Sequence, residues 1–265
     1  MTDRGASIRS YAALARVAFL DGTARRRTAL FAFLGNLAWF VIPYYVWRDA
    51  YSSTVDVGGF DWAQMRTYLV WAFLINGLLT FRVETQLFNR IRTGGILTEL
   101  MRPMDLQMGR LAMVVGGACA DGLSSIPSAL VLAGIFLHPL APPSAGAGFA
   151  FAVSVAMGFG VKFLISYLMA AVSFWTENIV GLVWLRSAVT DILSGAVVPL
   201  ALLPSPLAVV AHLSPFQAIV YIPLSLYLGR ASALPELAIQ LVWVIVLWFL
   251  ARAVWAAGLR RLRRC

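Results

Sequence analysis

The run ELAIQLVWVIVLWFLARAVWAA, residues 236–257, decides the fold class of this chain. As an α-helix rising about 1.5 Å per residue, it is long enough to cross the roughly 30 Å hydrocarbon core of a bilayer. The sequence LRRLRRC follows at residues 259–265 and suits contact with anionic lipid headgroups. Together they predict a membrane-spanning helix that ends at a basic, lipid-facing surface.

The composition of the whole chain extends this prediction. Of its 265 residues 60% are hydrophobic and 12% are charged, and the mean hydropathy is +0.80. Soluble domains carry about 25% charged residues, so the composition indicates a chain surrounded by lipid. The net charge of +9 first suggests nucleic acid. The basic residues are instead grouped in three segments separated by apolar runs, as in cytoplasmic loops, so we expect no nucleic-acid partner.

Six spanning helices are predicted, at about residues 28–47, 62–84, 110–137, 149–174, 179–199 and 236–257. The segments between them are outer loops at 48–61 and 138–148, an inner loop at 85–109 and an inner turn at 175–178. Six spans place both basic termini in the cytoplasm, whereas five or seven would place one outside. We therefore expect an all-α, polytopic protein of the cell inner membrane, multi-pass, with both termini cytoplasmic.

The N-terminal segment, residues 4–27, has a different pattern. Ile8, Tyr11, Ala15 and Phe19 recur at helical spacing, while arginines lie on another face. This pattern favours an interfacial helix along the cytoplasmic surface, and the alternative is a short solvated helix on the body of the protein. We expect one domain over 1–265, made of a cytoplasmic or interfacial segment (1–27), a six-span bundle (28–257) and a basic cytoplasmic tail (258–265).

The segment between the fifth and sixth spans, residues 200–235, is apolar but broken by five prolines, Pro204, Pro206, Pro215, Pro223 and Pro235. Proline removes a helical hydrogen bond, so this density excludes one straight span. Non-helical backbone at membrane depth must be surrounded by protein or water. The segment therefore predicts short re-entrant or interfacial helices on the outer side.

Three ionisable residues fall at one depth inside the predicted spans, namely Asp121, Lys162 and Asp191. Each lies about twelve residues, or roughly 18 Å, from the cytoplasmic end of its span, and Arg186 lies somewhat nearer the cytoplasm. Charge at mid-membrane is costly and marks a candidate functional site. We expect Lys162 to pair with Asp121 or Asp191. The four residues are then a candidate intramembrane polar cluster, either a neutralised packing pair or the polar lining of a substrate path.

Sequence motifs for catalysis are missing. The chain has no phosphate-binding loop G-x-x-x-x-G-K-[ST], no H-E-x-x-H and no G-x-S-x-G. Its two cysteines, Cys119 and Cys265, have no metal-ligand spacing with histidine. We therefore expect no enzyme activity, no catalytic residue, no metal site and no bound cofactor in this chain.

Four stretches carry a resemblance to a known family. They are GGILTELMRPMD (94–105), SFWTENIVGLVWL (173–185), SGAVVPLALLPSPL (194–207), and SPF with IPLSLYLG (214–216 and 222–229). In this order and spacing they resemble the permease subunit of ABC-2-type exporters, in particular a bacterial branch once grouped as a domain of unknown function. The G-x-L-x-x-x-L-x-R-P element and the later F-W-T-E are the most specific parts.

This resemblance implies a type V exporter-like architecture, in which the N-terminal helix is interfacial and an outer re-entrant hairpin lies between spans five and six. It implies efflux across the membrane by a dimer with a second permease, the same or homologous, and with two copies of a separate ABC ATPase that bind ATP and Mg. The docking (coupling) helix for the ATPase would comprise Gly94, Gly95, Ile96, Leu97, Thr98, Glu99, Leu100, Met101 and Arg102. The inner turn with Trp175 and Glu177 belongs to the same resemblance.

Two other classes of function stay open at the sequence level. One is an ATP-independent channel or scramblase-like protein. The other is a membrane-embedded enzyme or scaffold that acts on lipid, for which the polar cluster provides the candidate residues. Stable association with an ATPase, nucleotide-free flux and a lipid product would distinguish the three.

Overall fold

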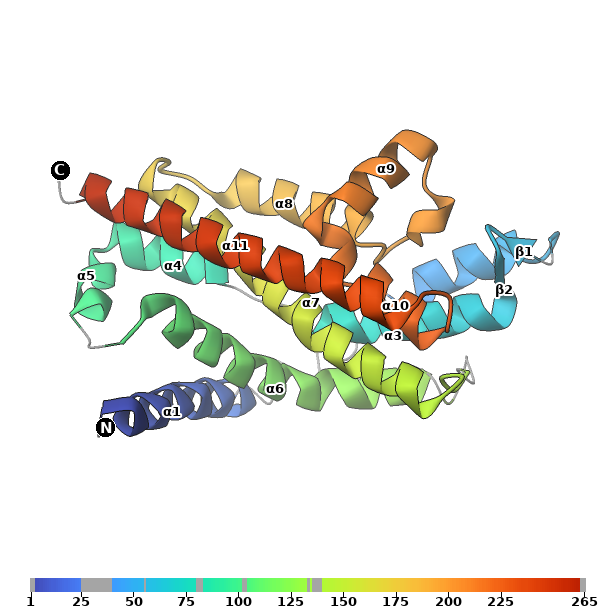
Figure 1. Cartoon of the computed structure of the whole chain (residues 1–265), viewed down its shortest axis with the longest axis horizontal. Coiled ribbons are helices and arrows are strands. Elements are labelled where there is room, and N and C mark those ends of the chain that lie inside the picture. The colour runs from blue at the N-terminus through green and yellow to red at the C-terminus, as the bar shows by residue number, and fades with distance from the viewer. Residues whose placement is uncertain are drawn as a thin grey trace.

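The computed structural model describes residues 3–24, 40–54, 56–79, 83–101, 104–132, 134 and 140–262. These residues are mostly helical, and most of the long helices run roughly along one axis (Figure 1). We call the end of the molecule that carries α5 (Gly95–Leu100) the α5 end, and the opposite end, with strands β1 and β2, the β end. In the described part of the chain, Ala145–Phe174 and Ala233–Arg261 are long and apolar enough to cross a membrane.

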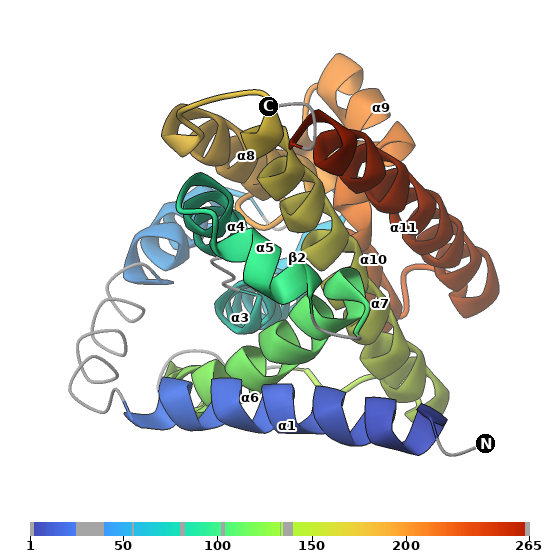
Figure 2. The same ribbon diagram turned by 90° about the vertical axis from the view of Figure 1, so that its left-hand side faces the viewer.

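Helix α1 (Asp3–Ala24) covers most of the predicted N-terminal segment and packs against the first half of α6 (Leu106–Leu132). Figure 2 shows it crossing the bundle beneath α6. The helices approach closely because α6 has Gly116 facing Ala15, where a Cβ would lie 1.9 Å from the Ala15 carbonyl oxygen. The Tyr11 hydroxyl also accepts the Asp105 N–H at 3.1 Å. The contact fixes α1 to the bundle, and its placement at a membrane surface stays a prediction.

The predicted outer loop after the first span contains a small hairpin. Within that span the structure describes a helical stretch over residues 40–50, and 28–39 lie outside the described residues. Strands β1 (Asp56–Val57) and β2 (Phe60–Asp61) then pair antiparallel. Gly58 and Gly59 have φ of 62° and 80°, as a type I′ turn requires. Tyr51 donates to the Phe60 carbonyl at 2.8 Å, and burial, with Asp56 and Asp61 nearby, raises its pKa to about 12.

The second span was predicted over 62–84, and its inner end lies beyond the end of the helix that the structure shows. Helix α3 (Trp62–Leu78) ends before it, and a separate helix α4 (Val83–Arg92) follows, with 80–82 outside the described residues. Helix α4 extends into the predicted inner loop. Gly94, with φ of 73°, then turns the chain into α5.

Helix α7 (Ala145–Ala171) begins four residues before the predicted fourth span. The Ser144 side chain caps it by accepting the Ala147 N–H at 3.1 Å. A short 3₁₀ helix η2 (Val172–Phe174) ends the span where predicted. In the inner turn the Asn178 side chain accepts the Val180 N–H at 2.9 Å and so starts the next helix.

The fifth span was predicted to reach residue 199, but α8 (Val180–Leu193) ends six residues earlier. The physical reason is Gly195, whose φ of 82° is a left-handed conformation that terminates helices. The Tyr68 hydroxyl donates to the Gly195 carbonyl at 2.6 Å, and the Tyr221 N–H donates to the Ser194 carbonyl at 3.0 Å. Contacts from two distant segments therefore hold the early end of α8.

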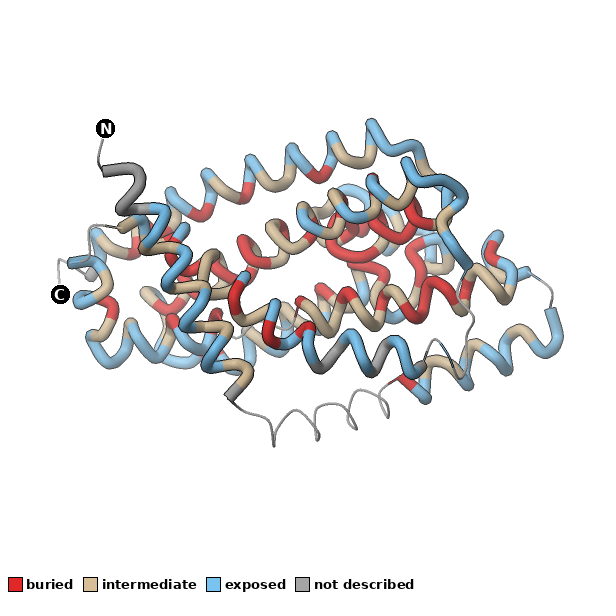
Figure 3. Tube along the Cα trace, turned by 90° about the horizontal axis from the view of Figure 1, so that it is seen from below, coloured by how far each residue is buried: buried red, intermediate tan, exposed pale blue. Residues whose placement is uncertain are grey.

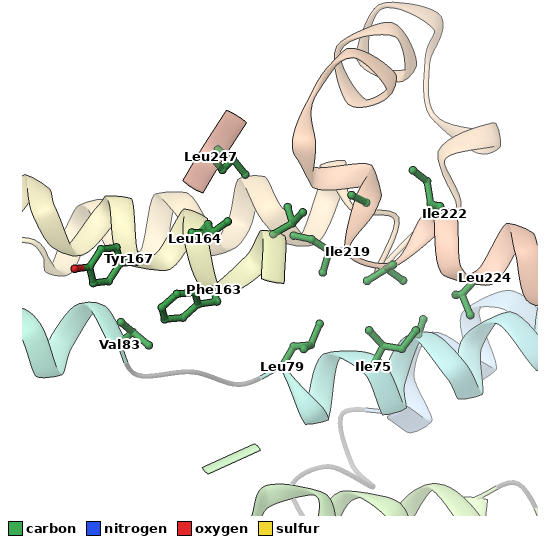
Figure 4. Close-up of a cluster of buried hydrophobic side chains, with 14 of the residues drawn as sticks. Ile75, Leu79, Val83, Phe163, Leu164, Tyr167, Ile219, Ile222, Leu224 and Leu247 are labelled. Atoms are coloured by element: carbon green, nitrogen blue, oxygen red, sulfur yellow. The ribbon is translucent and has the colours of Figure 1, made fainter. Parts of the chain in front are cut away.

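The proline-broken segment forms short helices, as the prolines predict. They are η3 (Leu200–Leu202), α9 (Ser205–Leu213), η4 (Pro215–Ala218) and α10 (Tyr221–Tyr227). Buried residues gather in the interior of the bundle (Figure 3). Residues 218–220, from the end of η4 to the residue before α10, are buried, and Figure 4 shows Ile219 among the core side chains. Gln240 on α11 (Ala233–Leu262) donates to the carbonyls of Ser154 on α7 and Ala218 at the end of η4, at 3.1 and 2.7 Å, and so ties this buried segment to two long helices.

Candidate functional site

The first candidate site is the exposed face of α5. Gly94 places this short helix across the α5 end of the molecule (Figure 1). Its Ile96 side chain is fully buried, whereas Leu97, Leu100 and Met101 are exposed, Met101 to 85%. One face of α5 therefore anchors it to the bundle and the other presents apolar side chains outward.

Glu99 holds α5 in place from the bundle side. Its carboxylate pairs with Arg110 on α6 and, at 3.5 Å, with Arg90 on α4. The Glu99 side chain is only 15% exposed and that of Arg110 only 7%. Glu99, one of the predicted docking residues, therefore faces the bundle and holds α5 against it. Arg102, another of them, lies outside the described residues.

The predicted inner turn, residues 175–178, lies beside the C-terminal end of α4. The Arg92 guanidinium donates to the Glu177 carbonyl at 2.7 Å, so the Glu177 backbone makes the contact. Trp175 is 44% exposed. The structure thus links the inner turn to the helix that leads into α5.

Asp105 connects the start of α6 to α11. Its carboxylate accepts the Met108 N–H at 2.9 Å, which caps α6, and it also pairs with Arg252. Together with the pair formed by Glu99 and Arg110, this makes two charged contacts at the α5 end, and they join α5 and the start of α6 to the distant helix α11.

The second candidate site is a cavity of about 620 Å³ between the helical stretch 40–50, α3, α7 and α8. Its volume falls in the usual range of small-molecule sites, roughly 300–1,000 Å³. Part of the lining is apolar and includes Phe40, Leu69, Phe73, Leu79 and Val197. The polar lining residues, which we call the polar wall, are Asn76, Lys162, Ser166, Arg186, Ser187, Thr190 and Asp191.

The charged groups of this wall differ in how they are paired. Arg186 Nε lies 3.0 Å from Glu84 Oε1, and the Glu84 side chain is 1% exposed, so this pair is direct and buried. Its N–H is not aligned as a hydrogen bond, and charge attraction holds it. Lys162 Nζ instead donates to Asn76 Oδ1 at 3.2 Å, and the Asn76 amide also bonds the Asp191 side chain. No oxygen of Asp191 lies within 4.0 Å of Lys162 Nζ among the described atoms.

The structure thus brings Lys162, Arg186 and Asp191 together, but Asp121 lies elsewhere. Asp121 is exposed on α6 and does not line the cavity. The expected pairing of Lys162 with Asp121 is therefore wrong, because equal depth does not place residues on facing sides of their helices. Sequence reasoning missed Glu84 and Asn76. Glu84 was placed at the end of a span, and Asn76 carries no charge to mark it.

Comparison with known proteins gives one match. The family model described as ABC-2 family transporter protein matches residues 37–264. No curated protein and no solved structure matches the chain. The match covers most of the chain, including both candidate sites, and leaves only α1 and its neighbours outside. This chain therefore belongs to the ABC-2 transporter family and is a permease component of an ABC transporter.

Proposed function

We propose that the chain is the permease subunit of an ABC exporter in the cell inner membrane, and that a separate ATPase docks on α5. The observation that carries this proposal is the exposed apolar face of α5. Apolar side chains gathered at the water-facing end of a membrane protein indicate contact with another protein. A dimer of permeases, the same or homologous, would provide the path, and two ATPase copies would hold ATP and Mg.

The contacts behind α5 suit a helix that transmits force. Glu99 ties α5 to Arg110, and Asp105, at the start of the same α6, pairs with Arg252 of α11. A displacement of α5 by the ATPase would therefore reach two long helices at once. The pair of Glu99 with Arg110 is largely buried, and hydrogen bonds between charged groups are strong and geometrically specific, which favours rigid coupling at this contact.

The topology that we propose has six spans and both termini in the cytoplasm. The start of α1 and the end of α11 lie at the α5 end (Figure 1), which suits the three basic segments. Helices α3 and α8 have 17 and 14 residues and fall short of about 20 for a straight span. In this topology the adjoining segments, α4 and the helices after residue 195, would complete their passage.

Copurification with the ATPase tests the proposal. The chain is purified in mild detergent after coexpression with candidate ABC ATPases from the same cell, and the retained ATPase is quantified. We expect Leu97→Arg to reduce retention about tenfold or more, since it places a charge in an apolar contact. Ala256→Arg, an exposed site near the α5 end of α11, is the matched control and should retain the ATPase.

Two results would contradict the proposal. One is that no ATPase is retained by the unaltered chain, and the other is that both arginine variants lose it equally. Liposome flux without nucleotide would then favour an ATP-independent channel or scramblase-like protein. A chemically altered lipid would favour an enzyme or scaffold.

A further inference from the structure

The cavity between α3, α7 and α8 has two opposite charges that are close but not in direct contact. Lys162 and Asp191 both line it, and Asn76 bridges them. A buried charge at membrane depth is stabilised best by a direct partner. Arg186, which also lines the cavity, has such a direct contact, at 3.0 Å, with Glu84, which lies behind the lining. The surroundings of the cavity therefore allow direct ion pairs, and the separation of Lys162 from Asp191 is specific to these two residues.

The ammonium of Lys162 has hydrogen-bonding capacity left over. An ammonium has three N–H donors, and in the described part of the chain one of them is used, by Asn76. Asp191 is half-buried at the cavity wall, so a ligand group can reach its carboxylate. The wall thus offers one cationic and one anionic partner a short distance apart.

The sum of charges decides which ligand fits. With Glu84 behind the wall, the four ionised groups Lys162, Arg186, Asp191 and Glu84 are neutral together. A singly charged ligand would engage one of the two spaced charges and add net charge to a region of low dielectric, which is costly. A ligand with both charges engages both and keeps the site neutral.

We propose that this cavity binds a zwitterionic amphiphile, with its anionic group at Lys162, its ammonium at Asp191 and one apolar chain along Phe40, Phe73 and Val197. That this amphiphile is the exported cargo rests on the proposed function of the chain as an exporter subunit. The binding itself needs only one copy of the chain, because all lining residues come from that copy. The same chemistry is found in a bilayer lipid and in a soluble amphiphile.

Direct binding to the purified chain tests the proposal. Three probes with fourteen-carbon chains are titrated in a neutral maltoside detergent and read by native mass spectrometry. They are zwitterionic myristoyl lysophosphatidylethanolamine, anionic myristoyl lysophosphatidylglycerol and cationic tetradecylamine. We expect the zwitterionic probe to bind about tenfold more tightly than either of the others, or roughly 1.4 kcal/mol.

Two charge-removing variants should shift the selectivity in opposite directions. Lys162→Met should weaken the two phosphate-bearing probes about tenfold and spare the amine. Asp191→Asn should weaken the zwitterion and the amine and spare the anionic probe. Opposite shifts cannot arise from partial unfolding, which would weaken all three. Asp121→Asn removes a carboxylate outside the cavity lining and is the matched control, with no change expected.

Two outcomes overturn the proposal. One is equal affinity of the unaltered chain for all three probes, and the other is an effect of Asp121→Asn as large as that of Asp191→Asn. A copurifying diacyl lipid displaced by the zwitterionic probe would support the binding and identify the bilayer as the source. If the zwitterionic probe binds to a chain that carries no copurifying lipid, the proposed binding is supported and a soluble amphiphile is identified as the source. The assay contains neither ATPase nor nucleotide, so its failure leaves the docking result on α5 unaffected.

Discussion

One face of α7 meets two very different environments within three turns. Ser154, Gly158, Lys162 and Ser166 are spaced by four and share that face. At Gly158 the backbone of Ala218 is so close that a Cβ would lie 2.6 Å from its carbonyl oxygen. At Lys162 and Ser166 the same face lines the cavity.

The difference shows where packing ends and a binding region begins. On the packed part the side chains are small and the buried backbone receives hydrogen bonds from Gln240. On the cavity part the side chains are polar and Lys162 is held away from Asp191. Arg186 of the same lining is in a direct ion pair with Glu84, which lies behind it. The following predictions distinguish groups that hold the structure from groups that are left for a ligand.

The largest effect is expected for Arg186→Met. The variant leaves the Glu84 carboxylate buried without its cation, and breaking such a pair costs about 3–5 kcal/mol. We expect the unfolding midpoint in detergent to fall by roughly 10 °C, measured by intrinsic fluorescence during heating.

The double variant Arg186→Met with Glu84→Met is the control for that loss. Replacing both members of a buried pair by apolar groups is often nearly neutral, so most of the stability should return. A double variant as unstable as Arg186→Met alone would show that the two groups do not act as a pair.

A smaller loss is expected for Gly158→Ala, which tests the packed part of the face. The new methyl group meets the Ala218 carbonyl, and overpacking of this kind costs about 1–3 kcal/mol. Gly160→Ala on the same helix is the matched control, since its Cβ would lie 3.8 Å from Val244 Cγ2. We expect the control to be neutral or slightly stabilising in the same heating measurement. Equal losses of stability in the two variants would show that Gly158 is no more tightly packed than Gly160, and would contradict the contrast between the packed part and the cavity part of α7.

Much of the helical architecture follows from local sequence, and its exceptions have tertiary causes. The short helix after Gly94 and the interruption of residues 200–235 are set by glycine and proline, whose effects on the backbone are local. The early end of α8 depends on Tyr68, far away in the chain. A closer reading of sequence would have found the β1–β2 hairpin, because two adjacent glycines flanked by short runs favour a type I′ turn.

In the candidate sites, too, the contacts between distant segments could not be predicted from sequence. Counting residues from the inner end of each span gave the shared depth of Lys162 and Asp191, but it gives no information on which face of the helix a residue occupies. Asp121 was therefore misplaced. Glu99 lay inside the predicted docking helix, and only the structure shows that its side chain points to Arg110. Depth and helix position are readable from sequence, whereas facing partners require the packed structure.

The smallest effect on stability is expected for Lys162→Met, although it removes a cation from the same wall as Arg186→Met. Methionine keeps most of the apolar stem, and losing a buried ammonium removes a desolvation cost that its hydrogen bond to Asn76 only partly offsets. Asp191 is half-buried at the cavity and retains its bond to Asn76, so no fully buried charge is left alone. We expect a change within about 1 kcal/mol in the heating measurement. A loss as large as that of Arg186→Met would make Lys162 a structural partner like Arg186. A near-neutral change in stability together with the roughly tenfold weaker binding of the zwitterionic probe would leave ligand contact as its role.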